Sequence, residues 1–111
     1  MNPLAITDYT ITTALGAGLH ANWERVRAGH SGLRPIDFLD VDDIQTSVGA
    51  VAGVDAVTLP AELAAFDCRN NRLAWLALQY DGFMAAVAAA GERYGPERVA
   101  VFMGTSTAGI H

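Results

Sequence analysis

The chain has 111 residues and a net charge of −5, and its seven basic residues are all arginines. An acidic chain without a basic cluster is not expected to bind nucleic acid, and no apolar run approaches the roughly 20 residues of a membrane-spanning helix. One cysteine cannot form an internal disulfide, and no positively charged segment precedes the first apolar residues as in a secretory signal. We therefore expect a cytoplasmic protein.

The first predicted elements are a strand and a helix joined by a short loop. Residues 4–13 are rich in β-branched and aromatic types, which favours a strand, and a glycine-containing loop over 14–18 follows. The next stretch predicts a helix over Leu19–Ala28, followed by Gly29 in the position where a glycine commonly ends a helix. Large apolar residues recur in this helix at the i, i+4, i+7 spacing of one face: Leu19, Trp23 and Val26.

The middle of the chain has weaker patterns. His30–Asp43 is predicted to be irregular, because its glycine, proline and four aspartates favour turns and exposure to solvent. A short strand is predicted over 46–51. Thr58 is expected to cap a short helix with Pro60 in its first turn, and this helix is predicted to end near Phe66.

The longest predicted element is one continuous helix over Arg69–Ala90. One stripe of this helix has apolar and small residues at i+3 and i+4 steps, namely Leu73, Leu76, Ala77, Tyr80, Met84, Val87, Ala88 and Gly91. Further large apolar residues lie off this stripe, so the helix is expected to be buried on more than one side. A turn at 94–96 leads to Val99–Met103, an unbroken apolar run that predicts a strand buried on both faces of an α/β sheet.

The loop after this last strand is the first candidate site, since α/β folds commonly bind ligands beyond the carboxyl ends of their strands. Gly104–Ala108 is similar in pattern to a nucleophile elbow with alanine in the final glycine position, which would make Ser106 the nucleophile. Such a serine requires an acid and a histidine base later in the chain. A tight turn whose hydroxyl groups bind the local backbone is the alternative.

Cys68 is the second candidate nucleophile. It lies at the predicted start of the long helix, near Arg69 and Arg72, and both positive charge and a helix N-terminus favour a reactive thiolate. Asp67 opposes this effect, and no histidine is close in sequence. The alternative is a small buried apolar residue, which is the commoner role of a lone cysteine.

The remaining polar residues do not form a recognised site. His20 is expected on a helix surface, His30 in a loop, and neither has metal-ligand spacing to the other or to His111. Gly16 and Gly18 have no third glycine at the dinucleotide-binding spacing. An acidic loop lacks the glycine and closing glutamate of a calcium site and is expected to be solvated; its carboxylates are Asp37, Asp40, Asp42 and Asp43. We predict no metal and no dissociable cofactor.

Four short motifs, in this order, resemble the N-terminal part of a β-ketoacyl-acyl carrier protein synthase, a condensing enzyme of the thiolase-like fold. Ala5–Thr7 and Ile11–Gly16 resemble the family's opening strand, V-I-T-G-x-G-x-x-x-x-x-G. Arg27–Leu33 is similar to its R-x-G-x-S-G-I turn. Ala88–Gly91 resembles the end of its A-x-x-x-A-G helix, and Arg98–Thr105 resembles its R-x-G-x-x-x-G-[ST] strand.

The chain also departs from the family pattern. Asp8 and Thr10 replace two glycines of the opening strand, which restricts the backbone conformations available there. The family's nucleophile motif ends in cysteine, whereas Gly109 ends the similar run in this chain, which also lies too early. The resemblance therefore covers about the first quarter of such an enzyme, and residues 1–111 are expected to be the N-terminal portion of its N-terminal domain, without its catalytic cysteine and histidines.

The resemblance implies a layered α/β/α fold with a mixed sheet and buried helices. It also implies a role for the final loop, which in this family lines the acyl pocket near a dimer interface. By position, the pocket-lining residues would be Thr105, Ser106, Thr107 and Ala108. Thr107 would lie nearest to the usual gating side chain.

Three functional interpretations follow. The resemblance implies an acyltransferase that condenses an acyl thioester with malonyl-carrier protein in fatty acid or polyketide-type biosynthesis. Its implied partners are acyl carrier protein and either a second copy of the chain, in a homodimer, or a synthase-like subunit, in a heterodimer. The alternative is a catalytically inactive subunit that pairs with an active condensing enzyme. An unrelated α/β hydrolase is favoured only by the elbow-like pattern at Gly104–Ala108.

Overall fold

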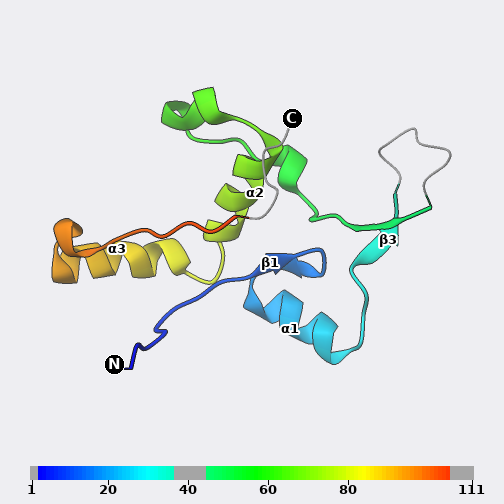
Figure 1. Cartoon of the computed structure of the whole chain (residues 1–111), viewed down its shortest axis with the longest axis horizontal. Helices are drawn as coiled ribbons and strands as arrows, with labels where there is room; N and C mark the ends of the chain where they lie inside the picture. The colour runs from blue at the N-terminus through cyan, green and yellow to red at the C-terminus, as the bar shows by residue number, and fades with distance from the viewer. Residues whose placement is uncertain (1–2, 37–44, 106–111) are drawn as a thin grey trace.

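The computed structural model describes residues 3–36 and 45–105 (Figure 1). The described chain is a mixed α/β arrangement with two small antiparallel sheets, which confirms the predicted α/β class. Its elements in chain order are β1 (Thr12–Thr13), β2 (Gly16–Ala17), α1 (Leu19–Arg27), β3 (Leu33–Pro35), β4 (Ser47–Gly49), three-residue η1 (Val54–Ala56), η2 (Ala61–Phe66), α2 (Arg69–Leu78), α3 (Phe83–Tyr94) and η3 (Pro96–Arg98).

The N-terminal segment is extended but pairs only at its end. The strand predicted over 4–13 was too long, because β1 contains only its last two residues and the segment before them has no strand assignment. β1 pairs antiparallel with β2, with Thr12 opposite Ala17 and Thr13 opposite Gly16. β-branched residues favour extended backbone, but a strand also needs a hydrogen-bonding neighbour.

Helix α1 follows its prediction closely, ending one residue before Ala28. Gly29 has a φ of 69°, and its N–H donates to the Val26 carbonyl at 3.0 Å while the His30 N–H donates to the Arg25 carbonyl at 2.9 Å. These two bonds form a Schellman motif, which satisfies two of the carbonyls left free at a helix end. The role predicted for Gly29 is confirmed.

A second hairpin lies where the sequence predicted an irregular segment. β3 pairs antiparallel with β4, with Leu33 opposite Gly49 and Pro35 opposite Ser47. The strand predicted over 46–51 is therefore confirmed in its central residues, while β3 was missed. Its proline was interpreted as a turn signal, although proline is compatible with a strand that has no neighbour on its other side.

The predicted continuous helix over Arg69–Ala90 is wrong. It is divided into α2 and α3, whose axes are bent by 72° at a short break. Asp81 and Gly82 lie in this break with φ values of 57° and 72°, in the left-handed region that ends a helix. The break places Asp81 beside the first turn of α1, a contact that the helical periodicity could not indicate.

The described elements have little common core. The buried apolar side chains among the described residues are Val54, which is 1% exposed, and Leu59. The Cα radius of gyration is 17.1 Å, compared with about 13 Å for a compact domain of this length. Figure 1 shows α3 and the β3 hairpin extending to opposite sides of α2. The helices therefore keep apolar faces exposed, contrary to the expected burial of the long helix on several sides.

Two further local predictions were wrong. Thr58 does not cap the following helix, because η2 begins after Pro60 without a side-chain cap and has 3₁₀ rather than α geometry. Val99–Met103 is not a buried strand in the described chain. It forms neither a strand nor a helix, and Val101, Phe102 and Met103 are 81%, 94% and 85% exposed. The apolar run favours extended backbone, but no neighbouring strand among the described residues pairs with it.

Candidate functional site

The predicted acyl-pocket loop lies mostly outside the described residues. Thr105 is exposed and follows the extended run Val99–Met103. Ser106, Thr107 and Ala108 lie beyond the described part of the chain, so the elbow-like turn and the pocket both stay predictions.

Cys68 lies directly before α2, at its N-cap position, with an exposed thiol. Both neighbouring arginines are paired with carboxylates. Arg72 donates two hydrogen bonds of 2.6 Å to Asp67, and Arg69 lies 3.4 Å from an oxygen of Asp55. The hydrogen bond from Arg72 lowers the pKa of Asp67, and the same bond raises the pKa of Arg72. The prediction of a buried apolar cysteine is wrong, and the arginines that would activate a thiolate are engaged by acids.

His20 and His30 occupy the positions that the sequence predicted. His20 is exposed on α1 and His30 is exposed after it. Among residues 3–36 and 45–105, no group of three or more histidine, cysteine, aspartate or glutamate residues could hold a metal ion. The acidic cluster Asp37, Asp40, Asp42 and Asp43 and His111 lie outside the described residues.

A buried polar cluster joins the first hairpin to α1. Asn22 is 5% exposed, and its Nδ2 donates to the Gly16 and Gly18 carbonyls at 2.8 Å and to the Ile11 carbonyl at 3.3 Å. The Thr13 hydroxyl donates to Asn22 Oδ1 at 2.5 Å. A buried amide with these partners holds the hairpin against the helix. Its role is structural, since its donors and acceptors are all engaged within the chain.

The N-terminus of α1 is occupied by a carboxylate from the α2–α3 break. The Leu19 N–H donates to both Asp81 oxygens, at 2.9 and 3.1 Å, and the Thr10 hydroxyl donates to Asp81 Oδ2 at 2.8 Å. A negative charge at this position is favourable because of the helix dipole. The phosphate of a dinucleotide would compete with Asp81 for the Leu19 N–H. This agrees with the absence of a third glycine at the dinucleotide-binding spacing after Gly16 and Gly18.

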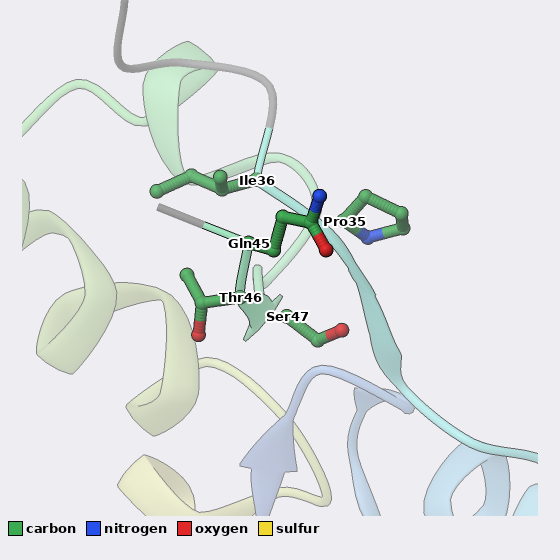
Figure 2. A pocket seen from close by; sticks show the side chains of 5 residues that line it. All are labelled: Pro35, Ile36, Gln45, Thr46 and Ser47. Carbon is green, nitrogen blue, oxygen red and sulfur yellow. The ribbon is translucent and has the colours of Figure 1, made fainter. Parts of the chain in front are cut away.

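A hollow lies at the end of the second hairpin where Pro35 is opposite Ser47 (Figure 2). It has a volume of about 700 Å³ and is lined by Pro35, Ile36, Gln45, Thr46 and Ser47. These side chains provide one amide and two hydroxyl groups, but no acid, base or thiol. The hollow could bind a polar group by hydrogen bonds, but its lining provides no group for acid–base or nucleophilic catalysis.

Two other hollows are mainly apolar. One of about 580 Å³ lies beside α1, lined by Tyr9, Ile11, Leu19, His20, Asn22, Trp23 and Val26. Another of about 300 Å³ lies between η2 and α2, lined by Leu59, Leu63, Phe66, Asn71, Ala74, Trp75 and Leu78. The first exposes Trp23 and Val26, which the periodic pattern of α1 had predicted to lie on one apolar face, and the second exposes Phe66. Such surfaces favour contact with other apolar groups.

The sequence did not predict the polar contacts made by Asn22 and Asp81. The Asp81-Gly82 dipeptide is a recognised turn signal, and it could have located the break in the long helix. Asn22 lies in the first turn of α1, and no sequence pattern indicates that it is buried. Its partners lie in the preceding hairpin, whose geometry depends on the tertiary structure.

No protein-family model, no curated protein and no solved structure matches the chain. Among the described helices, none is by itself long and apolar enough to cross a membrane, whereas α2 and α3 satisfy that test of length and composition only as a bent pair.

Proposed function

We propose that the protein is a 3-oxoacyl-[acyl-carrier-protein] synthase of the thiolase-like fold, and that residues 1–111 are part of its N-terminal domain. The observation that carries this proposal is the order of the four family-like motifs between Ala5 and Thr105. The catalytic cysteine and histidines are not among these motifs. The chain's contribution would be to build the framework and one wall of the acyl pocket.

The structure supports the proposal by giving three residues of the Arg27–Leu33 motif definite structural roles. Gly29 ends α1 with a positive φ, and Ser31 Oγ accepts the Leu33 N–H at 3.1 Å. A Cβ on Gly32 would lie 2.9 Å from Ala14, which is too close for a side chain. The turn therefore favours glycine at positions 29 and 32 and uses the hydroxyl of Ser31, in the pattern of the family motif.

The departure from the family pattern at Thr10 also has a structural reason. Its hydroxyl donates to the Asp81 carboxylate at the N-terminus of α1, so a residue with a hydrogen-bonding side chain replaces a permissive glycine. This departure is no evidence of lost catalysis. The enzyme is therefore preferred here to the inactive subunit.

In the proposed reaction, an acyl group moves from a carrier-protein thioester to a cysteine thiolate, releasing the carrier thiol. Malonyl-carrier protein then loses CO₂, and the resulting carbanion attacks the acyl-enzyme thioester, displacing the cysteine. The product is a 3-oxoacyl thioester two carbons longer. Hydrogen-bond donors aimed at the thioester oxygen would stabilise the charge that develops there. Thr105, Ser106, Thr107 and Ala108 would contact the acyl chain.

The test uses the polypeptide produced from the native gene, incubated with acyl-carrier protein and malonyl-carrier protein and analysed by mass spectrometry. A 3-oxoacyl product two carbons longer, absent when malonyl-carrier protein is omitted, is expected. No product from the protein alone, with altered product length when it is added to an active synthase, would instead identify the inactive partner subunit. No effect in either assay would refute both. The intact mass, compared with 11.7 kDa, establishes which polypeptide is being tested.

A further inference from the structure

We propose that α2 and α3 form a two-state hinge, which the Asp81 carboxylate holds bent and which straightens into one continuous helix when that carboxylate leaves the N-terminus of α1. The proposal rests on the geometry of the break, the contacts of Asp81 and the helical pattern on both sides. It is independent of the proposed enzymatic function.

The break contains a conformational cost that the bent state must offset. Asp81 adopts a φ of 57°, and it is the one non-glycine residue among the described residues with a positive φ. L-residues disfavour this region, although aspartate tolerates it better than most. Gly82, with a φ of 72°, absorbs the rest of the turn without a side-chain penalty. These two residues are the hinge.

The contacts of Asp81 offset this cost. Both carboxylate oxygens accept the Leu19 N–H, at 2.9 and 3.1 Å, and the Thr10 hydroxyl adds a bond of 2.8 Å. The close approach favours Gly18, because its φ is 86° and a Cβ there would lie 3.2 Å from both the Asp81 carboxylate and the Tyr80 ring. Charge-assisted bonds of this kind are stronger than those between neutral groups. Asp81 thus acts as a latch between segments that are 62 residues apart in the chain.

The apolar periodicity on the two sides of the break fits the straight state, whereas the Asp81-Gly82 turn signal opposes it. The stripe of apolar and small residues from α2 continues through Tyr80 into Met84 and Val87 of α3 at helical spacing. All three side chains are exposed in the bent state, so the bend does not remove their apolar surface from solvent. A continuous helix would also give the amides after Leu78 the carbonyl partners four residues earlier that the break removes.

Straightening would change two other parts of the molecule. The first turn of α1 would lose its carboxylate, because the same group holds the hinge and the Leu19 N–H. The hollow between α3 and the N-terminal segment would open, since its lining comes from both sides: Thr7, Asp8, Ala86, Ala89, Ala90, Arg93 and Tyr94. The hinge therefore couples the stability of α1 to the position of α3.

The test measures the distance between spin labels at Asn70→Cys and Glu92→Cys by pulsed electron paramagnetic resonance, in the full chain with Cys68→Ser. With a rise of 1.5 Å per residue, the two Cα atoms would lie about 33 Å apart in a straight helix and about 27 Å apart in the pair bent by 72°. We expect the shorter distance to dominate in the parent, which keeps Asp81, and the longer distance to dominate after Asp81→Ala. Asp55→Ala, which removes an exposed carboxylate near α2, is the matched control and should keep the shorter distance.

Gly82→Ala provides a second arm, because alanine at a φ of 72° is strained while it favours a helix interior. It should move the population toward the longer distance with Asp81 still present. If both variants keep the distance of the parent, the hinge proposal is refuted. If Asp81→Ala loses its helical circular dichroism, the Gly82→Ala result decides: the longer distance supports the hinge and the parent distance overturns it.

Discussion

Replacing Asn22 by leucine tests whether the buried amide holds the first hairpin against α1. The substitution removes three bonds of 2.8, 2.8 and 2.5 Å and a weaker one of 3.3 Å. Each good bond contributes about 1 kcal/mol net, so we expect a loss of about 3 kcal/mol. The Ile11 and Gly18 carbonyls keep backbone partners, which limits the penalty from unsatisfied groups.

Amide hydrogen exchange measured by NMR is the suitable assay, because it reports the opening of this part of the chain. A loss of about 3 kcal/mol corresponds to exchange that is roughly 100-fold faster. The Gly18 amide, bonded to the Ile11 carbonyl at 2.9 Å, is the most direct probe. Asn70→Leu, at an exposed position of α2, is the control and should leave that amide unchanged. An increase of less than threefold in Asn22→Leu would show that the cluster does not stabilise the hairpin.

Asn22→Asp gives the same test with a magnitude that depends on pH. At neutral pH a carboxylate would replace the amide donor opposite three carbonyl oxygens, so folding would raise the pKa of the new side chain. The folded state would then bind a proton more tightly than the unfolded state, whose pKa is about 3.9. The defect should be largest above the raised folded pKa and shrink as the pH falls toward the unfolded value. A defect independent of pH would contradict the assigned orientation of the amide.

Three further predictions concern separate parts of the chain. Gly32→Ala should lower the free energy of unfolding by about 1–3 kcal/mol through overpacking. Gly91→Ala, with nothing within 4 Å of the added Cβ, should raise the free energy of unfolding by about 0.5–1 kcal/mol. Urea unfolding followed by circular dichroism compares the two variants, and equal effects would contradict the packing around Gly32. Arg72→Gln should return the pKa of Asp67 toward 3.8 in a carboxyl NMR titration, because the hydrogen bond that lowers this pKa is lost. The small contribution of this exposed ion pair to stability is present above pH 3.8 and is lost as the pH falls through the lowered pKa of Asp67 in the folded state. In the proposed synthase, Thr107→Trp should shorten the acyl chains accepted in a competition assay with mixed chain lengths, and an unchanged profile would refute its assignment to the pocket.

Sequence patterns gave correct predictions where the interactions that stabilise an element all lie within that element. The periodic face of α1 and the following glycine predicted its limits to within one residue, because a helix and its Schellman end use hydrogen bonds between residues at most five apart. The exposed positions of His20 and His30 followed from the same element. Of the predicted pocket loop, only Thr105 lies in the described chain, so the candidate site itself stays a prediction.

The misread elements each depend on a distant partner. Val99–Met103 has the composition of a strand, but a strand forms only against another strand, and the described chain provides none for it. β3 was missed for the opposite reason, since its pairing with β4 outweighs local turn signals.

The amino-acid sequence by itself determined α1, its capping Gly29 and the α/β class, through the conformational preferences of adjacent residues. The Asp81-Gly82 dipeptide is a turn signal within the long helical run, but only the tertiary structure decided that Asp81 lies at the first turn of α1. A carboxylate meets the first amide of α1 across 62 residues, and a contact over such a distance depends on the path of the whole intervening chain rather than on any periodic pattern within it.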